Sequence, residues 1–254
     1  MAIDKTVPTA AEAVADVAGG ATMAVGGFGL CGIPMELITA VHEAGVTGLR
    51  VVSNNCGVDD WGLGILLRDH RLARVTASYV GENKEFARQY LSGELEVELV
   101  PQGTLAERLR AGGCGIPAFY TPAGVGSPVA EGGLPWRHHP DGTAAVASPP
   151  REVREFTFAD RTRPYVLEQA IRCDFALVHA RLGDRHGNLV FDQAARNFNP
   201  LCAMAAAVTI AEVEQLVEPG ELDPDHVHLP GVFTQRVVQA DPAVPKRVER
   251  RTTR

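Results

Sequence analysis

The sequence lacks the features that would place it in a membrane, in an oxidising compartment or on a nucleic acid. Its five cysteines are scattered and form no C-x-x-C pair, which indicates a reducing compartment and neither a disulfide framework nor a zinc site. No apolar run approaches the length of a membrane span, and the N-terminus shows no charged-then-apolar signal pattern. A net charge of −7 argues against nucleic acid or an anionic membrane as the main partner. We therefore expect a cytoplasmic protein.

Two other patterns are too weak to indicate a binding site. Residues 246–254 carry five basic side chains with no aromatic residue among them, which is typical of a solvated tail or a subunit contact. The pairs His138-His139 and His226-x-His228 lie in segments rich in Pro, Asp and Gly, which favours surface loops. We predict no metal site.

Apolar segments of strand and helix character alternate along the first half of the chain. This rhythm predicts an α/β fold with an open, mostly parallel sheet and helices on both faces. A change of character follows at residues 112–150, which are rich in Gly and Pro and predict an irregular, loop-rich insertion in a single domain of residues 1–254. The predicted strands lie at 21–25, 49–53, 74–78, 94–99, 153–158 and 175–179, and the predicted helices at 10–18, 34–44, 62–69, 82–92 and 104–111, the last with Thr104 as its N-cap.

A glycine-rich segment, residues 26–32, joins the first predicted strand to the helix that begins at Pro34; we call it the glycine loop. Such a junction leaves backbone N–H groups at the positive end of a helix dipole, where a phosphate or a carboxylate can bind. Gly27, Gly29 and Gly32 also spell G-x-G-x-x-G, the dinucleotide fingerprint. A tight turn that binds no ligand is the remaining alternative.

Two observations argue against a dinucleotide. The next strand ends in Ser53-Asn54-Asn55, where a dinucleotide-binding protein would offer an acidic side chain to the ribose. Bulky Phe28 also stands at the tip of the loop. Cys31 and Cys56 lie in glycine-rich loops and could act as nucleophilic thiols, but a small residue tolerated beside glycine is the better interpretation, since no histidine adjoins either.

Neutral amides follow two of the predicted strands directly. Asn54 and Asn55 follow the strand at 49–53, and Gln102 follows the strand that ends near Val100. Ligands of open α/β sheets bind beyond the carboxyl ends of the strands. Amide N–H groups supply hydrogen bonds without placing a competing charge beside an anionic substrate. We predict that these three residues bind substrate; amides that cap their own loops are the alternative.

Longer blocks of sequence resemble family I coenzyme A transferases, in particular the A-type subunit of the branch that acts on 3-oxoacids. The resemblance runs from about residue 7 to the C-terminus. The blocks that carry it are Gly26-Gly27-Phe28 with Gly32-x-Pro34, Ser53-Asn54-Asn55-Cys56-Gly57-Val58-Asp59, Ser78-Tyr79-Val80-Gly81-Glu82-Asn83, Leu91-Ser92-Gly93-Glu94-Leu95-Glu96-Val97, Pro101-Gln102-Gly103-Thr104-Leu105-Ala106-Glu107-Arg108 and Ala195-Arg196-Asn197-Phe198-Asn199.

The resemblance implies an enzyme subunit that moves CoA from succinyl-CoA to acetoacetate by a ping-pong reaction. It implies CoA as a substrate, with no permanently bound cofactor, and a nucleophilic glutamate on a separate B subunit in a heterodimer or a dimer of heterodimers. The block that carries this glutamate, Ser-Glu-Asn-Gly, is absent here; Gly81-Glu82-Asn83 is the nearest match, and we interpret Glu82 as a first-turn residue that complements a helix dipole. The residues implied to contact CoA are Gly26, Gly27, Phe28, Gly29, Leu30, Cys31 and Gly32.

Two alternatives stay open at this point. The same enzyme class could use other acids, either acetate with acetoacetate or 3-oxoadipate. A chain of the same fold could also bind a sugar phosphate or CoA without catalysis.

Overall fold

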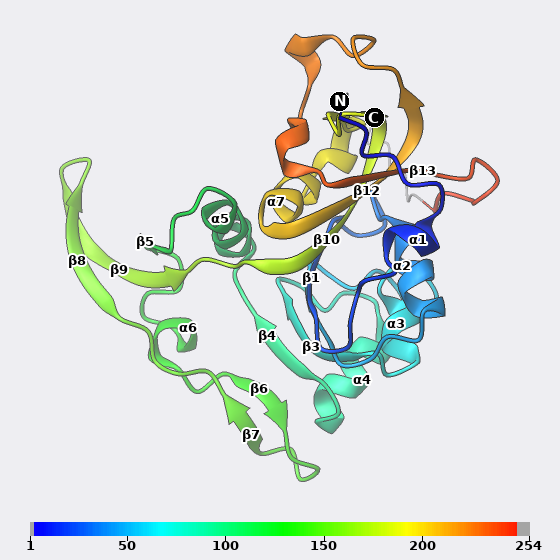
Figure 1. Ribbon diagram of the computed structural model, residues 1–254. Coiled ribbons are helices and arrows are strands. Elements are labelled where there is room, and N and C mark those ends of the chain that lie inside the picture. Colours follow the sequence, from blue (N-terminus) through cyan, green and yellow to red (C-terminus); the bar gives the residue numbers. More distant parts are fainter. Residues whose placement is uncertain (1–2, 248–254) are drawn as a thin grey trace, which may run out of the picture.

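The protein, described here by a computed structural model, forms one large sheet with helices on both sides (Figure 1). Residues 3–247 are described, so most of the predicted basic tail, from residue 248 on, lies outside the described residues. Within them the sheet has eight strands, in the order β13-β12-β10-β1-β2-β3-β4, with β11 paired to β10. Neighbours in this order are parallel, and only the β10–β11 pair is antiparallel. The strands are β1 (Thr22–Val25), β2 (Leu49–Val52), β3 (Leu72–Ala77), β4 (Glu96–Leu99), β10 (Cys173–Asp184), β11 (Leu189–Val190), β12 (Ala206–Val217) and β13 (Arg236–Gln239).

The first strand shows how both faces of the sheet are buried. Successive side chains of a strand point to opposite faces, so Met23 and Val25 pack into one apolar core and Ala24 into the other. The core around Met23 includes α1 (Ala10–Ala13), α2 (Met35–Glu43), α3 (Gly64–Arg68) and α4 (Lys84–Ser92), and the core around Ala24 includes α5 (Gln102–Gly113) and α7 (Asn199–Met204). The main sheet is parallel except at β11, and helices pack on both of its faces. The predicted α/β fold is therefore confirmed.

The predicted boundaries of the first and the last of the five helices are wrong. The helix expected at 10–18 ends at Ala13, although Thr9 caps its start by accepting the Glu12 N–H at 3.1 Å. The helix expected at 104–111 begins at Gln102, directly after Pro101, so Thr104 lies inside the helix and is not its N-cap. No helix among residues 3–247 is long and apolar enough to cross a bilayer.

Short elements fill the insertion at 112–150, and a long hairpin follows it. In Figure 1 the hairpin formed by β8 (Val153–Phe158) and β9 (Arg161–Gln169) extends away from the main sheet. We predicted β8 but not its partner β9, because the turn residues Ala159 and Asp160 are not the glycine pair that usually marks a two-residue hairpin. Both nevertheless adopt positive φ, at 48° and 59°. The remaining elements are β5 (Ala118–Thr121), α6 (Pro128–Glu131), β6 (Pro135–His138), β7 (Ala144–Ala147), β8 (Val153–Phe158), β9 (Arg161–Gln169) and the short 3₁₀ turns η1 (Gln193–Arg196), η2 (Pro224–His226) and η3 (Gly231–Phe233).

A buried charge cluster joins the β8–β9 hairpin to the edge of the main sheet. Glu98 of β4 accepts hydrogen bonds from Arg108 of α5 at 2.8 Å and Arg74 of β3 at 2.7 Å. Arg151, just before β8, lies 3.6 Å from the same carboxylate and pairs with buried Glu168 of β9. Burial opposes ionisation of Glu98, but Arg108 and Arg74 outweigh burial and hold its pKa below the ordinary value. The β8–β9 hairpin is therefore anchored by charges that are paired at the edge strand β4 of the main sheet.

Candidate active site

The glycine loop leaves the carboxyl end of β1 as a closed turn. Gly27, Gly29 and Gly32 adopt φ values of 121°, 58° and 70°, which favour glycine because a Cβ atom would clash with the backbone. Phe28 and Cys31 exchange two backbone hydrogen bonds, at 3.0 and 2.9 Å, which closes the tip of the loop. The Phe28 side chain is left 48% exposed at this tip. The loop therefore presents its backbone and one aromatic ring toward solvent at the sheet edge.

Two asparagines from the segment around α7 hold the loop from behind. Asn199 is fully buried, and its amide donates hydrogen bonds to the carbonyls of Gly32 at 3.0 Å and Ala195 at 2.8 Å. Asn197 donates to the Cys31 carbonyl at 3.0 Å. The Asn199 amide fills the space where a Gly26 side chain would lie, since a Cβ there would stand 1.9 Å from its Oδ1. The block at 195–199, noted in the sequence only for its resemblance, thus fixes the shape of the loop.

All three predicted amide residues meet at the edge of the sheet beside the glycine loop. The Gln102 amide donates to Asn54 Oδ1 at 2.8 Å, and the Asn54 amide donates to Asn55 Oδ1 at 3.2 Å. Asn55 Oδ1 also accepts the Gly29 N–H at 3.1 Å, and Ser78 donates to Asn54 Oδ1 at 2.7 Å. We call Gln102, Asn54 and Asn55 the amide row. Residues 48 positions apart in sequence become neighbours because parallel strands end at the same edge.

The members of the amide row differ in exposure. Asn54 and Asn55 are 2% and 8% exposed, whereas Gln102 is exposed at the first turn of α5. The buried pair is fixed by hydrogen bonds, and the exposed amide can reach a bound molecule. An uncharged amide at a helix N-terminus can donate to a carboxylate or to a developing oxyanion. That these residues bind substrate stays a prediction.

The N-terminus of α2 is occupied by a side chain of the protein. Glu212 of β12 accepts the backbone N–H groups of Glu36 at 2.9 Å and Leu37 at 3.1 Å with one carboxylate oxygen. We expected these N–H groups to be free for an anionic ligand, and that expectation is wrong, because a buried carboxylate already satisfies them. This arrangement also removes the pyrophosphate position that a dinucleotide would need at this helix.

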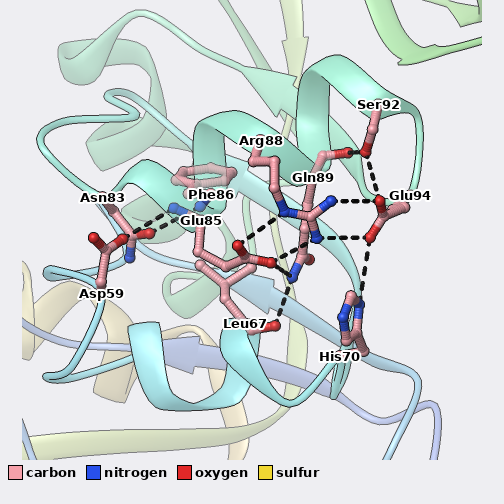
Figure 2. A network of polar contacts seen from close by, with 10 residues as sticks. All are labelled: Asp59, Leu67, His70, Asn83, Glu85, Phe86, Arg88, Gln89, Ser92 and Glu94. Atoms are coloured by element: carbon pink, nitrogen blue, oxygen red, sulfur yellow. Dashed lines mark hydrogen bonds and ion pairs between the residues drawn. The ribbon is translucent and has the colours of Figure 1, made fainter. Parts of the chain in front are cut away.

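The structure also places the Gly81-Glu82-Asn83 block. Asn83, not Glu82, is the N-cap of α4: its Oδ1 accepts the Phe86 N–H at 2.8 Å, and Asp59 accepts the Glu85 N–H at 2.9 Å (Figure 2). Glu82 precedes the cap and is exposed, so its interpretation as a first-turn residue of the helix is wrong. The helix dipole is instead complemented by Glu85, which pairs with Arg88 (Figure 2).

The two loop cysteines have different surroundings. Cys56 is fully buried, and burial raises the pKa of its thiol well above the ordinary value, so it is not available as a thiolate nucleophile. Cys31 is half-buried in the glycine loop. The Cys56 position therefore fits the interpretation as a small residue packed beside glycine.

A cavity of about 630 Å³ lies beside the glycine loop, and no residue of the amide row lines it. Loop residues from Leu30 to Ile33 form one wall, and residues Ala240 to Arg247 form another. A buried histidine, His179, and two glutamates, Glu212 and Glu214, lie between these walls. We did not predict this group from the sequence. The available signal was a pair of acidic residues at alternate positions in the mostly apolar strand β12.

Comparison with known proteins identifies the family. Residues 7–240 match the sequence model described as Coenzyme A transferase. The chain belongs to the coenzyme A transferase family. It is 66% identical over 252 residues to a protein of Mycobacterium tuberculosis named as the probable A-type subunit of succinyl-CoA:3-ketoacid coenzyme A transferase, covering 99% of this chain and 100% of that protein. The predicted family and the predicted transferase class are confirmed.

Two longer proteins contain the same fold unit. The chain is 52% identical to the mitochondrial succinyl-CoA:3-ketoacid coenzyme A transferase 2A of Mus musculus over 96% of its own length, but spans only 46% of that protein. The crystal structure of an acyl-CoA transferase from Escherichia coli O157:H7, in a thioester complex with CoA, superposes with a TM-score of 0.77 at 21% identity. The match covers 96% of this chain and 48% of that one, and it supports the fold.

Proposed function

We propose that this chain is the A-type subunit of a 3-oxoacid CoA-transferase that moves CoA from succinyl-CoA to acetoacetate together with a B subunit. The observation that carries the proposal is the amide row beside the glycine loop, which offers uncharged donors and no carboxylate of its own. The names of relatives at up to 66% identity support succinyl-CoA and a 3-oxoacid as the substrates and the existence of a partner subunit.

The reaction follows from carboxylate and thiolate chemistry. A glutamate carboxylate that belongs to the B subunit first attacks the thioester carbonyl of succinyl-CoA, the C–S bond breaks, and a succinyl-glutamyl anhydride and CoA thiolate form. The thiolate then attacks the glutamyl carbonyl, which releases succinate and leaves a glutamyl-CoA thioester. Acetoacetate repeats the two steps in reverse, yielding acetoacetyl-CoA and the free glutamate. The thioester bond energy is conserved because every acyl intermediate stays activated.

The residues of this chain serve that chemistry by orientation and by hydrogen bonding. Each attack on a carbonyl places negative charge on its oxygen, and the Gln102 amide is positioned by Asn54 to donate a hydrogen bond to such an oxygen or to the substrate carboxylate. The glycine loop allows the thioester and the pantetheine arm to approach the backbone closely. Docking of the B subunit over this edge excludes water, which would otherwise hydrolyse the anhydride.

The proposal also accounts for the place of Glu82. Glu82 is exposed before the α4 N-cap, and no hydrogen bond joins it to the amide row within residues 3–247, which supports a nucleophile on the partner. CoA is then a substrate of a shared site, and the assembly is a heterodimer or a dimer of heterodimers.

Coexpression of this chain with the candidate B subunit tests the proposal. We expect acetoacetate-dependent loss of succinyl-CoA in the complex only, with CoA trapped on a glutamate of the B subunit. Turnover by this chain alone would point to Glu82 as the nucleophile. Higher activity with acetate or 3-oxoadipate than with acetoacetate would reassign the acid. Binding of CoA without turnover with any partner would indicate a non-catalytic protein.

A further inference from the structure

A buried histidine bridges two glutamates on the neighbouring strand. His179 of β10 and Glu212 of β12 are paired in register, and His179 Nδ1 lies 3.1 Å from Glu212 Oε1. On its other side, His179 Nε2 lies 3.1 Å from Glu214 Oε1. His179 and Glu212 are only 8% and 4% exposed. Both ring nitrogens face carboxylate oxygens, so the imidazolium form, with a proton on each nitrogen, donates a hydrogen bond to both glutamates.

Two hydrogen-bonded paths connect this imidazolium to the glycine loop. In the first, Glu212 accepts from His179 with one oxygen and binds the α2 N-terminus, at Glu36 and Leu37, with the other. In the second, the backbone N–H of His179 donates to Asn199 Oδ1 at 2.9 Å, and the amide of Asn199 holds the Gly32 carbonyl. The glycine loop is therefore held at Gly32 by Asn199, and the helix that follows it is held at its N-terminus by Glu212.

The electrostatic surroundings favour the charged ring. Burial opposes protonation of His179, but Glu212 and Glu214 outweigh burial and raise its pKa above the ordinary value. Glu214 is in turn paired with Lys246 at 2.6 Å. Burial opposes ionisation of Glu214, but Lys246 and His179 outweigh burial and lower its pKa. Besides His179, the titratable and charged groups around the cavity are Cys31 from the glycine loop, Glu36 from α2, Glu212 and Glu214 from β12, Asp192 from the segment before η1, and Asp241, Lys246 and Arg247 from the segment after β13.

We propose that His179 is a positioning residue of the substrate site: its imidazolium holds Glu212 against the α2 N-terminus and thereby fixes the glycine loop. A neutral ring would turn a lone pair toward either Glu212 or Glu214, and the repelled carboxylate would move. If it were Glu212, the α2 N-terminus would lose its acceptor. The support that the imidazolium gives to Glu212 is therefore complete below the ordinary histidine pKa, and it weakens as the pH rises through the raised value, because one of the two neutral tautomers repels Glu212. This inference rests on the proposed function for its effect on catalysis, and the loop geometry can be tested without turnover.

The test compares the wild type with Glu214→Gln and with Glu218→Gln. Glu214 is the accessible partner of His179, so its replacement removes one charge and leaves Glu212 in place. Glu218, just beyond the end of β12, pairs with exposed Arg185 at 2.7 Å and provides the matched control. In histidine and backbone-amide NMR titrations of the full-length chain, we expect the Gly29 and Gly32 amide signals to follow the His179 titration. In Glu214→Gln both titrations should move to lower pH by about one unit.

The reconstituted complex provides the second readout. We expect the alkaline limb of kcat/KM for succinyl-CoA to move down by about one pH unit in Glu214→Gln, with KM rising more than kcat falls. The Glu218→Gln profile should coincide with that of the wild type. Loop amides that do not follow His179 would overturn the inference whatever the enzyme acts on. A complex without turnover whose loop amides do follow His179 would instead count against the proposed acids and leave the positioning role supported.

Discussion

Truncation of Gln102 separates a role in catalysis from a role in folding. Gln102→Ala removes the exposed amide at the start of α5 and nothing that is buried. Asn54 Oδ1 loses the Gln102 hydrogen bond of 2.8 Å but keeps the one from Ser78 at 2.7 Å, so no buried acceptor is left unsatisfied. We therefore expect the free energy of unfolding to change by less than about 1 kcal/mol.

The expected effect on catalysis is much larger. Loss of one preorganised donor to a developing oxyanion lowers kcat by about 10²–10³, or about 2.7–4 kcal/mol of transition-state stabilisation. Asn54→Ala is a harsher change, because Asn54 is 2% exposed and its loss leaves Ser78 and Gln102 without a shared acceptor. We expect it to lower turnover and also to destabilise the fold by about 1–3 kcal/mol.

The assay is steady-state transfer between succinyl-CoA and acetoacetate by the reconstituted complex, with urea unfolding of each variant measured in parallel. Glu107→Gln serves as the control, since Glu107 is exposed on the same helix and, within residues 3–247, pairs only with Arg110, at 2.9 Å. A Gln102→Ala complex with the stability and the kcat of the wild type would refute the reasoning and remove Gln102 from the site. A loss of activity that tracks a loss of stability would indicate a structural role.

Three further changes test the packing around the site. Gly26→Ala should destabilise the fold by about 1–3 kcal/mol in urea unfolding, because its Cβ would stand 1.9 Å from Asn199 Oδ1; an unaffected midpoint would contradict this. Glu98→Gln should cost about 3 kcal/mol at neutral pH, because Arg108 loses its charge partner at 2.8 Å and keeps Glu168 only at 3.9 Å. That penalty should shrink as the pH falls below 4.5 and through the lowered pKa of Glu98, where the wild type also loses the charge. Exposed Cys114 should react with a thiol reagent in the native state, while the three buried thiols should react only on unfolding, as mass spectrometry of labelled peptides would reveal.

Much of the site could be located from the sequence because it depends on short-range signals. An apolar strand followed by glycines marks a βα junction, and an amide directly after a strand marks the ligand-binding edge. These rules predicted that Asn54, Asn55 and Gln102 lie at one edge of the sheet, where the structure joins them by hydrogen bonds. The β9 strand escaped because its turn uses Ala159 and Asp160, which carry no hairpin signature.

The sequence by itself determined the alternating α/β pattern, the position of the glycine loop and, through its long family blocks, membership of the coenzyme A transferases. Only the tertiary structure decided what occupies the α2 N-terminus. The occupant is the Glu212 carboxylate, 176 residues away from Glu36 in sequence, which also hydrogen-bonds to His179 on the adjacent strand. Periodicity and capping act over a few residues, whereas the pairing of His179 with Glu212 depends on the register of two parallel strands. Register is set by the packing of the whole sheet, so no local pattern could predict it.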